Sequence, residues 1–475
     1  MVTKLMAFRG KPTSYSIHDW KNMREIALCI LLEITENNRK SHTILKETFE
    51  ESKRRGVMPD NRDRAFTERL VVGTLDRMIT IDTVLSRFSR RPLRLLKPVI
   101  RGILRTGVYQ LMYMDRVPAS AACNEAVELA KLHGLEGLGG FVNGIMRAVA
   151  REVDSGGEKV TVFAEDWQRY SIPKWLCRMI TAQYGPEQAA GIFDAFLQER
   201  PETLRFNLSR TGDEDPADAE KRIAESLQKD GISFRKIDYG KILAESGLEL
   251  PGGMLPVVCE VPDSGDITRT ESFQKGWVTI QDPASALVAA CADPKQDDRV
   301  IDVCAAPGGK AMAVADRLLL MGGRGTVEAR DVSAQKVALL DENIRRCGFC
   351  NIHTAVQDAL KEDEDSFYRA DILIADLPCS GIGVIAKKPD IKLNLKSFSI
   401  EELQQLQRDI LMNISRYVKP RGKLIYSTCT ITQEENEQNV RWAAERLGFH
   451  LLNEWKLLPA REYDGFYIAV LEKRY

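Results

Sequence analysis

Two cysteines stand directly after apolar segments that read as buried strands. Cys379 follows "ADILIADLP", and Cys429 follows "KLIYST" further along the chain. A thiolate is a strong nucleophile that can also leave again, so either cysteine could form a transient covalent bond with an electron-poor carbon. Asp376, three residues before Cys379, could exchange a proton or a hydrogen bond beside that carbon. Spacing alone does not decide which thiol attacks, nor why two are present.

A turn of small residues, "CAAPGGK" (304–310), follows another strand-like segment and opens a helix. Such a turn lets backbone N–H groups approach a ligand at the edge of a sheet. It matches neither the G-x-G-x-x-G pattern of dinucleotide folds nor a P-loop. Two carboxylates end the next two strand-like segments: Asp331 could accept the hydroxyls of a ribose, and Asp358 would lie near an adenine.

These features fit S-adenosylmethionine better than NAD, because the glycines that cradle a diphosphate are missing and S-adenosylmethionine has no phosphate. The alternative interpretation of the turn is a plain connection between strand and helix that binds no ligand. The predicted cofactor-binding residues are Cys304, Ala305, Ala306, Pro307, Gly308, Gly309, Lys310, Asp331, Asp358 and Asp376.

A doubly wound α/β domain is expected to position these residues. From about residue 272 to residue 475, strand-like and helix-like segments alternate. The expected strands are "RVIDVCA", "GTVEARDV", "NIHTAVQ", "ADILIADL", "GKLIYSTC" and "FYIAVLEK", the last paired antiparallel with "HLLNEWKLL". A helix is expected to begin at a capping box formed by Ser399 and Glu402. This Rossmann-like domain would hold the chemistry.

Two further regions precede that domain. Residues 15–155 carry apolar side chains at helical spacing, as in "REIALCILLEI", and predict an all-helical domain. Residues 160–270 combine a strand-like "ETLRFNLSR" with helical segments, and predict a small α+β module after a linker at "VDSGGEK". A chain of 475 residues is too long for one ordinary core, so a multidomain protein is expected.

One segment of the helical region is strongly basic. Between residues 87 and 105 the charged side chains are all cationic: Arg87, Arg90, Arg91, Arg94, Lys97, Arg101 and Arg105. Uninterrupted positive charge attracts a polyanion such as RNA, although an ordinary solvent-exposed helix face would give the same pattern. The net charge of the chain is −1, so only local patches of this kind could bind nucleic acid.

The composition argues against several other classes of protein. Hydrophobic residues make up 44% and charged residues 28%, and no apolar run reaches the roughly 18 to 20 residues that cross a bilayer. "MVTKLMAFRGKP" lacks the apolar core of a signal peptide, so a cytoplasmic protein with reduced cysteines is expected. The five histidines are scattered, and Cys347 and Cys350 form a lone C-x-x-C, so we expect no metal site. We also expect the protein to be a monomer.

Long motifs resemble two known families. "RAFTERLVVGTLDR", "VIRGILRTGVYQLMYMDRVPASAACNEAVELAK" and "FVNGIMRAVARE" resemble the NusB family, a helical RNA-binding fold, which implies RNA contact by the basic segment. Asp76, in "GTLDR", stands where that family more often has a basic residue. "CAAPGGK", "DLPCSGIG", "PDIK", "LQRDIL" and "YSTCTITQEEN" resemble the RNA cytosine-5 methyltransferases of the NOL1/NOP2/Sun family. The order of the regions is similar to that of bacterial 16S rRNA methyltransferases.

The resemblance implies a role for each thiol. In this family the cysteine of the S/A-T-C motif, here Cys429, adds to carbon 6 of the cytosine, which makes carbon 5 nucleophilic. The P-C cysteine, here Cys379, helps to release the product; DNA cytosine methyltransferases use that position for attack instead. Lys310 could favour the thiolate, and Asp376 could hold the base. The predicted catalytic residues are Cys429, Cys379, Asp376 and Lys310.

Other functions give weaker fits. The main alternative is a non-catalytic RNA-binding or ribosome assembly factor with a retired methyltransferase domain, and the same chemistry on tRNA is another. An amino methyltransferase would carry [N/D]-P-P-[Y/F] where this chain has D-L-P-C. An NAD-dependent oxidoreductase would need the glycine fingerprint that is absent.

Overall fold

The computed structural model describes residues 15–57, 60–212, 215–246, 249, 254–262 and 266–474, so the segment "MVTKLMAFRGKP", which lacks the apolar core of a signal peptide, lies outside the described residues. The chain divides into two compact units, Met1–Ala182 with Lys388–Asn394, and Gln183–Lys387 with Leu395–Tyr475. Among the described residues, no helix is long and apolar enough to span a bilayer.

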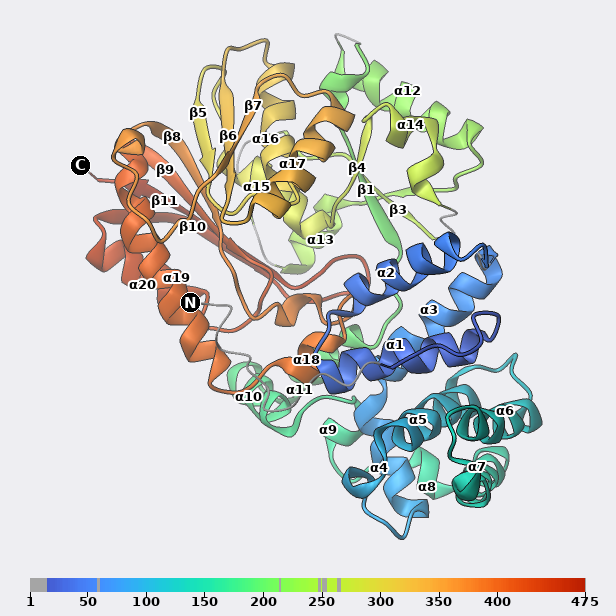
Figure 1. Cartoon of the computed structure of the whole chain (residues 1–475). Helices are drawn as coiled ribbons and strands as arrows, with labels where there is room; N and C mark the ends of the chain where they lie inside the picture. The colour runs from blue at the N-terminus through green and yellow to red at the C-terminus, as the bar shows by residue number, and fades with distance from the viewer. Residues whose placement is uncertain are drawn as a thin grey trace. The chain divides into compact units, whose positions relative to one another are not determined.

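The first unit, the helical unit, is built around helix α1 (blue in Figure 1). Nearly every apolar residue of α1 is buried, because α2, α3 and α5 pack around it. Its helices are α1 (Met23–Asn37), α2 (Ser41–Arg54), α3 (Asn61–Asp76), α4 (Met78–Phe88), α5 (Pro98–Tyr113), α6 (Ala119–Leu132), α7 (Gly139–Asp154), α8 (Glu158–Thr161), α9 (Asp166–Arg169) and most of α10 (Lys174–Tyr184). The all-helical prediction for this region is confirmed.

A short segment from far along the chain completes the helical unit. It contains α18 (Asp390–Asn394) and the whole "PDIK" motif. The Lys392 side chain is fully buried, and its Nζ donates to Asp76 Oδ1 at 2.8 Å and to the Asp76 carbonyl at 2.6 Å. Burial lowers the pKa of Lys392, and Asp76 opposes that shift. Asp76 is therefore the counter-charge of a buried lysine. Asp390 adds a second contact by accepting from Ser41 Oγ at 2.6 Å.

Two histidines come together in the same unit, so the prediction that the histidines lie apart was wrong for this pair. The rings of His18 and His133 are 4.8 Å apart, and with Glu25 they form a group that could hold a metal ion. The buried Glu25 carboxylate already accepts from His18 Nδ1 at 2.8 Å and from the backbone N–H groups of His18 and Asp19. In this structure Glu25 ties the segment before α1 to that helix.

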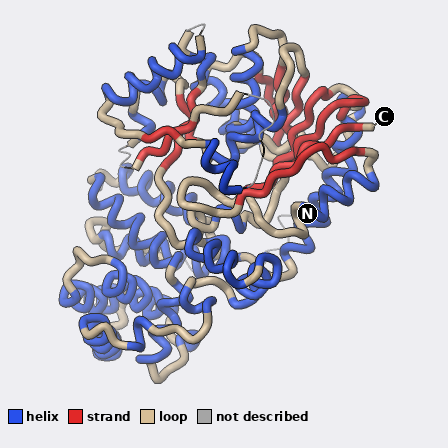
Figure 2. Tube along the Cα trace, turned by 180° about the vertical axis from the view of Figure 1, so that it is seen from behind, coloured by secondary structure: helices blue, strands red, loops and turns tan. Residues whose placement is uncertain are grey.

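The second unit contains a seven-stranded sheet, the larger red group in Figure 2. Its strands lie in the order β10-β11-β9-β8-β5-β6-β7, with β7, β6, β5, β8 and β9 parallel and β11 antiparallel to both of its neighbours. The strands are β5 (Arg299–Asp302), β6 (Thr326–Asp331), β7 (Ile352–Val356), β8 (Ala370–Asp376), β9 (Val418–Thr428), β10 (Phe449–Leu457) and β11 (Phe466–Lys473). The predicted Rossmann-like sheet with a terminal antiparallel pair is confirmed.

Helices cover both faces of this sheet. One core joins the sheet to α15 (Pro283–Ala292), α16 (Gly309–Leu320) and α17 (Ala334–Cys347). The other joins it to α19 (Ser399–Ile414) and α20 (Glu437–Arg446). The expected capping box at α19 was wrong by one position: the helix begins at Ser399 itself, whose Oγ accepts from Lys396 N. Both faces of the sheet are therefore covered by helices, and the ends of the strands are the parts of the sheet that can carry functional side chains.

A small module packs on the same unit. Its sheet has the order β2-β3-β1-β4. The strands are β1 (Glu202–Phe206), β2 (Arg235–Lys236), β3 (Val258–Val261) and β4 (Val278–Ile280), and the helices α11 (Pro186–Phe196), α12 (Pro216–Lys229), α13 (Tyr239–Ser246) and α14 (Glu271–Gln274). Asp316 of α16 accepts from the backbone N–H groups of Leu208 and Ser209 and lies 3.8 Å from Arg205. These buried contacts join the module to the α/β domain. The region boundaries at residues 160, 270 and 272 remain a prediction.

Candidate active site

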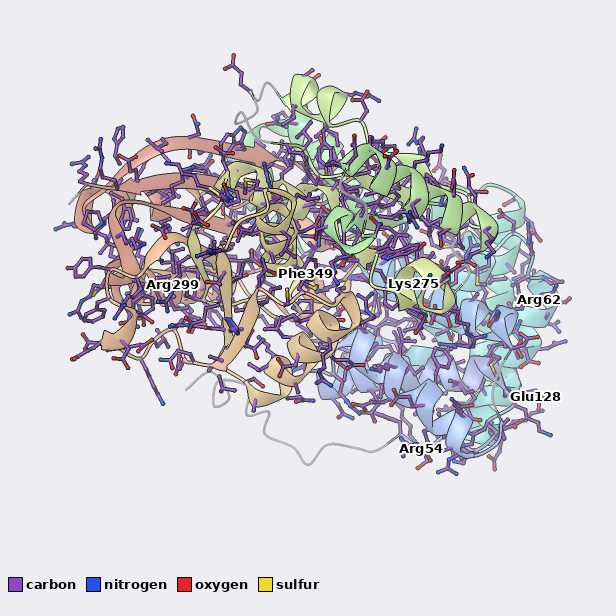
Figure 3. The ribbon with its side chains drawn as sticks, turned by 90° about the horizontal axis from the view of Figure 1, so that it is seen from above. Arg54, Arg62, Glu128, Lys275, Arg299 and Phe349 are labelled. Carbon is purple, nitrogen blue, oxygen red and sulfur yellow. The ribbon has the colours of Figure 1, made fainter. Side chains whose placement is uncertain are left out.

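Polar side chains gather at the carboxyl ends of the parallel strands. Asp302 ends β5, Asp331 ends β6, Asp376 ends β8, and Cys429 follows β9 directly. Because these strands are neighbours and parallel, their ends meet at one edge of the sheet (Figure 1). Figure 3 labels Arg299, which begins β5 at the opposite edge.

The structure brings the two thiols together. Cys379 Sγ and Cys429 Sγ are 3.3 Å apart, and both residues are partly exposed. Their loops also share backbone hydrogen bonds, from Leu377 N to Ser427 O at 3.2 Å and from Gly383 N to Cys429 O at 3.0 Å. The hydrogen bond to Cys429 and then burial raise the pKa of the Cys379 thiol well above its usual value. Cys379 therefore holds its proton at neutral pH.

An ion pair lies beside the thiols. Lys310 Nζ is 2.6 Å from Asp376 Oδ2, and Ser427 Oγ donates to Asp376 Oδ1 at 3.0 Å. Burial opposes the lysine charge, but Asp376, Asp302 and Cys429 outweigh it and raise the pKa of Lys310. The lysine is thus a fixed positive charge that acts on Cys429 as well as on Asp376.

Asp302 was missing from the predicted site. It is buried, its Oδ1 accepts from Cys304 N at 3.4 Å, and its Oδ2 is buried without a hydrogen-bond partner. Burial, followed by repulsion from Asp376, raises the pKa of Asp302 to about 7. The only sequence signal was one carboxylate within the apolar "RVIDVCA". An unpartnered buried carboxylate is suited to a cationic ligand group.

The "CAAPGGK" turn is fixed between β6 and α17. Ala305 N donates to Arg330 O at 2.8 Å, and Asn343 Nδ2 donates to Pro307 O at 3.0 Å. Gly308 has a φ of +110° and stands directly before α16, and a Cβ there would lie 2.6 Å from Leu340 Cδ1. Glycine is required here for both conformation and space. The turn therefore presents a rigid backbone to the strand-end edge.

The two other predicted acids line the same edge. Asp331 is almost fully buried, and Lys336 Nζ lies 3.2 Å from its Oδ1. Gln357 N donates to Asp331 O at 3.0 Å, which holds the end of β7 against that of β6. Asp358 is partly exposed and accepts from Leu360 N. Val332, directly after Asp331, has 59% of its surface exposed and offers an apolar face.

The lone C-x-x-C does not lie at this edge. Cys347 is buried and lies 3.7 Å from both Asn207 Nδ2 and Thr279 Oγ1, whereas Cys350 is exposed. Cys291 and Cys259 are buried, as expected of small apolar side chains in a core.

Comparison with known proteins relates both units to described families. A family model of the 16S rRNA methyltransferases RsmB/F matches residues 289–472, and one of the NusB family matches residues 21–151. The probable ribosomal RNA small subunit methyltransferase B of Bacillus subtilis is 35% identical over 88% of this chain and 87% of its own length. Its namesake from Synechocystis is 31% identical over 95% of this chain and 99% of its own length.

Solved structures share the fold. PH0851 matches with a TM-score of 0.74 at 23% identity, over 97% of this chain and 100% of its own length. NSun6 from Pyrococcus horikoshii, solved with SFG, matches with a TM-score of 0.52 at 23% identity, over 63% of this chain and 98% of its own.

Proposed function

Because the chain belongs to the family of ribosomal RNA small subunit methyltransferase B, we propose that it methylates carbon 5 of a cytosine in 16S ribosomal RNA. The observation that carries this proposal is the pair of thiols 3.3 Å apart beside the ion pair of Lys310 and Asp376. A methyltransferase that acted on an amino group would need no such pair.

Each side chain has a separate task in this reaction. Cys429 adds as a thiolate to carbon 6 of the cytosine, and the Lys310 charge stabilises that thiolate before attack. Asp376 binds the N3 and amine edge of the base, which increases the electron demand at carbon 6. After methyl transfer a base removes the carbon 5 proton, and the Cys429 thiolate leaves. Cys379, still protonated, assists this release.

S-adenosylmethionine, the cofactor of this family, supplies the methyl group as a sulfonium. The residues at the strand ends fit it. Asp302, whose Oδ2 has no partner, would accept the cofactor's ammonium group, and Asp331 would accept the ribose hydroxyls once the exposed Lys336 swings aside. The exposed Val332 would pack against the adenine, with Asp358 at its edge. The rigid "CAAPGGK" backbone lies between these contacts.

Binding of S-adenosylmethionine should tighten as the pH rises from 6 to 7.5. Asp302 has a pKa of about 7, so it is mostly neutral at pH 6 and mostly an anion at pH 7.5, and only the anion attracts the ammonium group. The expected gain in affinity is roughly eightfold, before the cofactor's own amino group begins to lose its proton. Asp376, Asp331 and Lys310 are the charged groups that act on the same carboxylate.

Calorimetric titration of the wild type and of Asp302→Asn across that range measures the effect. The variant should bind more weakly at pH 7.5, with little dependence on pH. An equal rise in affinity for the variant would assign the pH dependence to another group.

The helical unit is proposed to position the RNA through its basic segment. Three of the seven cations are already engaged: Arg87 donates to Lys159 O, Arg101 pairs with Glu36, and Arg105 makes a bidentate pair with Asp82. The remaining four are exposed around the turn between α4 and α5: Arg90, Arg91, Arg94 and Lys97. Phosphate contacts of this kind fix the RNA while the catalytic pocket receives one unstacked base.

Replacing Arg90, Arg91 and Arg94 together by glutamine should weaken RNA binding at least tenfold near 0.1 M salt. If all three contact phosphates, the slope of log affinity against log salt should fall by about two. Filter binding across a salt series measures both. The matched control replaces Lys46, Lys53 and Arg54 on α2, where Figure 3 shows Arg54 at the surface. Equal weakening by both triple variants would mean that only total charge matters.

Transfer of labelled methyl groups tests the proposed function. The protein is incubated with small-subunit ribosomal RNA, with 30S precursor particles or with tRNA, and the modified position is mapped by bisulfite sequencing. Labelling of a ribosomal cytosine that disappears in Cys429→Ala supports the proposal. Tight RNA binding without transfer to any of these substrates would favour an assembly factor with a retired methyltransferase domain, and transfer to tRNA alone would correct the substrate.

A further inference from the structure

We propose that Glu435 and Asn436 form a clamp that sets the separation of the two thiols. The proposal rests on the two-thiol reaction described above. Neither side chain touches a thiol or the reacting atoms, so both are positioning residues. In the sequence they form the end of "YSTCTITQEEN", seven residues after Cys429 at most.

Glu435 holds the loop that carries Cys379. It is fully buried, and its two oxygens accept four hydrogen bonds. Two of these come from Ser380, the residue after Cys379: Ser380 N donates to Oε1 at 2.8 Å, and Ser380 Oγ donates to Oε2 at 2.6 Å. The others come from Gln407 Nε2 at 3.1 Å and Thr432 Oγ1 at 2.8 Å. The position of Cys379 is thus fixed through its neighbour.

Asn436 holds the loop that carries Cys429, and it does so on both sides of the cysteine. Its Oδ1 accepts from Thr428 Oγ1 at 2.5 Å, and its Nδ2 donates to the carbonyl of Thr430 at 3.0 Å. Thr428 and Thr430 are the residues directly before and after Cys429. Two consecutive side chains therefore grip the two thiol loops separately.

A direct hydrogen bond joins the two loops within this clamp. Ser380 Oγ lies 2.8 Å from Thr430 Oγ1. Because Ser380 Oγ already donates to Glu435, Thr430 must be the donor to Ser380. The hydrogen bonds run from the Cys429 loop through the Cys379 loop to one carboxylate, so the 3.3 Å between the sulfurs depends on that carboxylate.

The clamp has little tolerance for substitution because every group around Glu435 donates. Burial raises the pKa of Glu435, and the hydrogen bonds from Ser380, Thr432 and Gln407 oppose that shift. Among the described residues no lysine or arginine forms an ion pair with it, and its carboxylate is stabilised by the hydrogen bonds from Ser380, Thr432 and Gln407. A glutamine at this position would turn an N–H group toward two of the four donors.

The test separates the attack on carbon 6 from the release of the product. RNA with 5-fluorocytosine at the target has no carbon 5 proton to remove, so release is blocked and the rate of covalent complex formation reports attack by Cys429 and methyl transfer without release. On ordinary RNA, the steady-state fraction of covalent complex reports release. Glu435→Gln should lower turnover on ordinary RNA at least tenfold and increase the covalent fraction at least fivefold, with the attack rate changed less than threefold.

Glu434→Gln is the matched control. Glu434 is the preceding residue and accepts from Gln183 instead of from a thiol loop, so this variant should behave as the wild type in all three measurements. Thr430→Val is the second variant: it removes the bond between the loops, leaves all four donors of Glu435 in place, and should increase the covalent fraction in the same direction. It decides the question if Glu435→Gln does not fold, as judged by thermal unfolding.

Two kinds of failure are distinguishable. If the wild type forms no covalent complex with the fluorinated RNA, the two-thiol reaction itself is wrong. If the wild type forms it and both clamp variants match the wild type in turnover and covalent fraction, only the clamp is overturned.

Discussion

Cys379→Ala should accumulate a covalent complex with its RNA, and Cys429→Ala should form none. The expectation follows because the proton on Cys379 and the charge near Cys429 give the two thiols different reactivity. Cys379 carries a raised pKa and keeps its proton, so it is the poorer nucleophile at neutral pH, while Lys310 places a positive charge near Cys429. Without Cys379, attack and methyl transfer proceed, but release is slow.

Denaturing gel electrophoresis with labelled RNA measures this directly. The complex in Cys379→Ala should exceed that of the wild type more than tenfold, and the double variant with Cys429→Ala should show none. Cys350→Ala, which removes an exposed cysteine away from the site, should match the wild type. A complex that forms in Cys429→Ala and is absent in Cys379→Ala would reverse the roles of the two thiols.

Asp376→Asn should lower the rate of methyl transfer by a factor of about 10² to 10³, with cofactor affinity changed much less. The amide cannot neutralise Lys310, and it loses one of the two oxygens that accept from Lys310 and Ser427. Asparagine also presents an N–H group where the cytosine amine would approach. The base should therefore bind more weakly, and the electron demand at carbon 6 should be lower.

Single-turnover kinetics with saturating cofactor isolate that loss from substrate binding. Asp371→Asn is the matched control, because Asp371 lies on the same strand and pairs with Lys419 at 2.6 Å, but near the opposite end. The control should stay within about twofold of the wild type. Near-normal transfer by Asp376→Asn would remove this carboxylate from the reaction.

Much of the site was predictable because its geometry follows from local patterns. Apolar runs such as "ADILIADL" mark buried parallel strands, and parallel strands end at one edge, so Cys379, Cys429, Asp376 and Asp331 had to meet there. The small residues of "CAAPGGK" likewise predicted a close backbone turn. These conclusions need only the order of the strands along the chain and the sidedness of a parallel sheet.

Other features depend on pairs that no local pattern specifies. Glu36 of α1 and Asp82 of α4 pair with Arg101 and Arg105 of α5, so the charge of the basic segment looked larger in the sequence than it is on the surface. Asp302 looked like one more strand residue, because its significance lies in an unpartnered oxygen. The contact between His18 and His133 likewise joins the segment before α1 to the end of α6, which lie far apart in the sequence.

The burial of Lys392 against Asp76 has a consequence for the order in which the protein can be made. During synthesis from the N-terminus, the ten helices up to α10 emerge long before α18, so the helical unit lacks its last part until residue 394 has left the ribosome. The Asp76 carboxylate has no Lys392 to pair with while most of the α/β domain is being translated. A fragment that ends at residue 182 lacks the segment Lys388–Asn394 and its buried lysine. Its helical unit should therefore be less stable than the same residues in the whole chain.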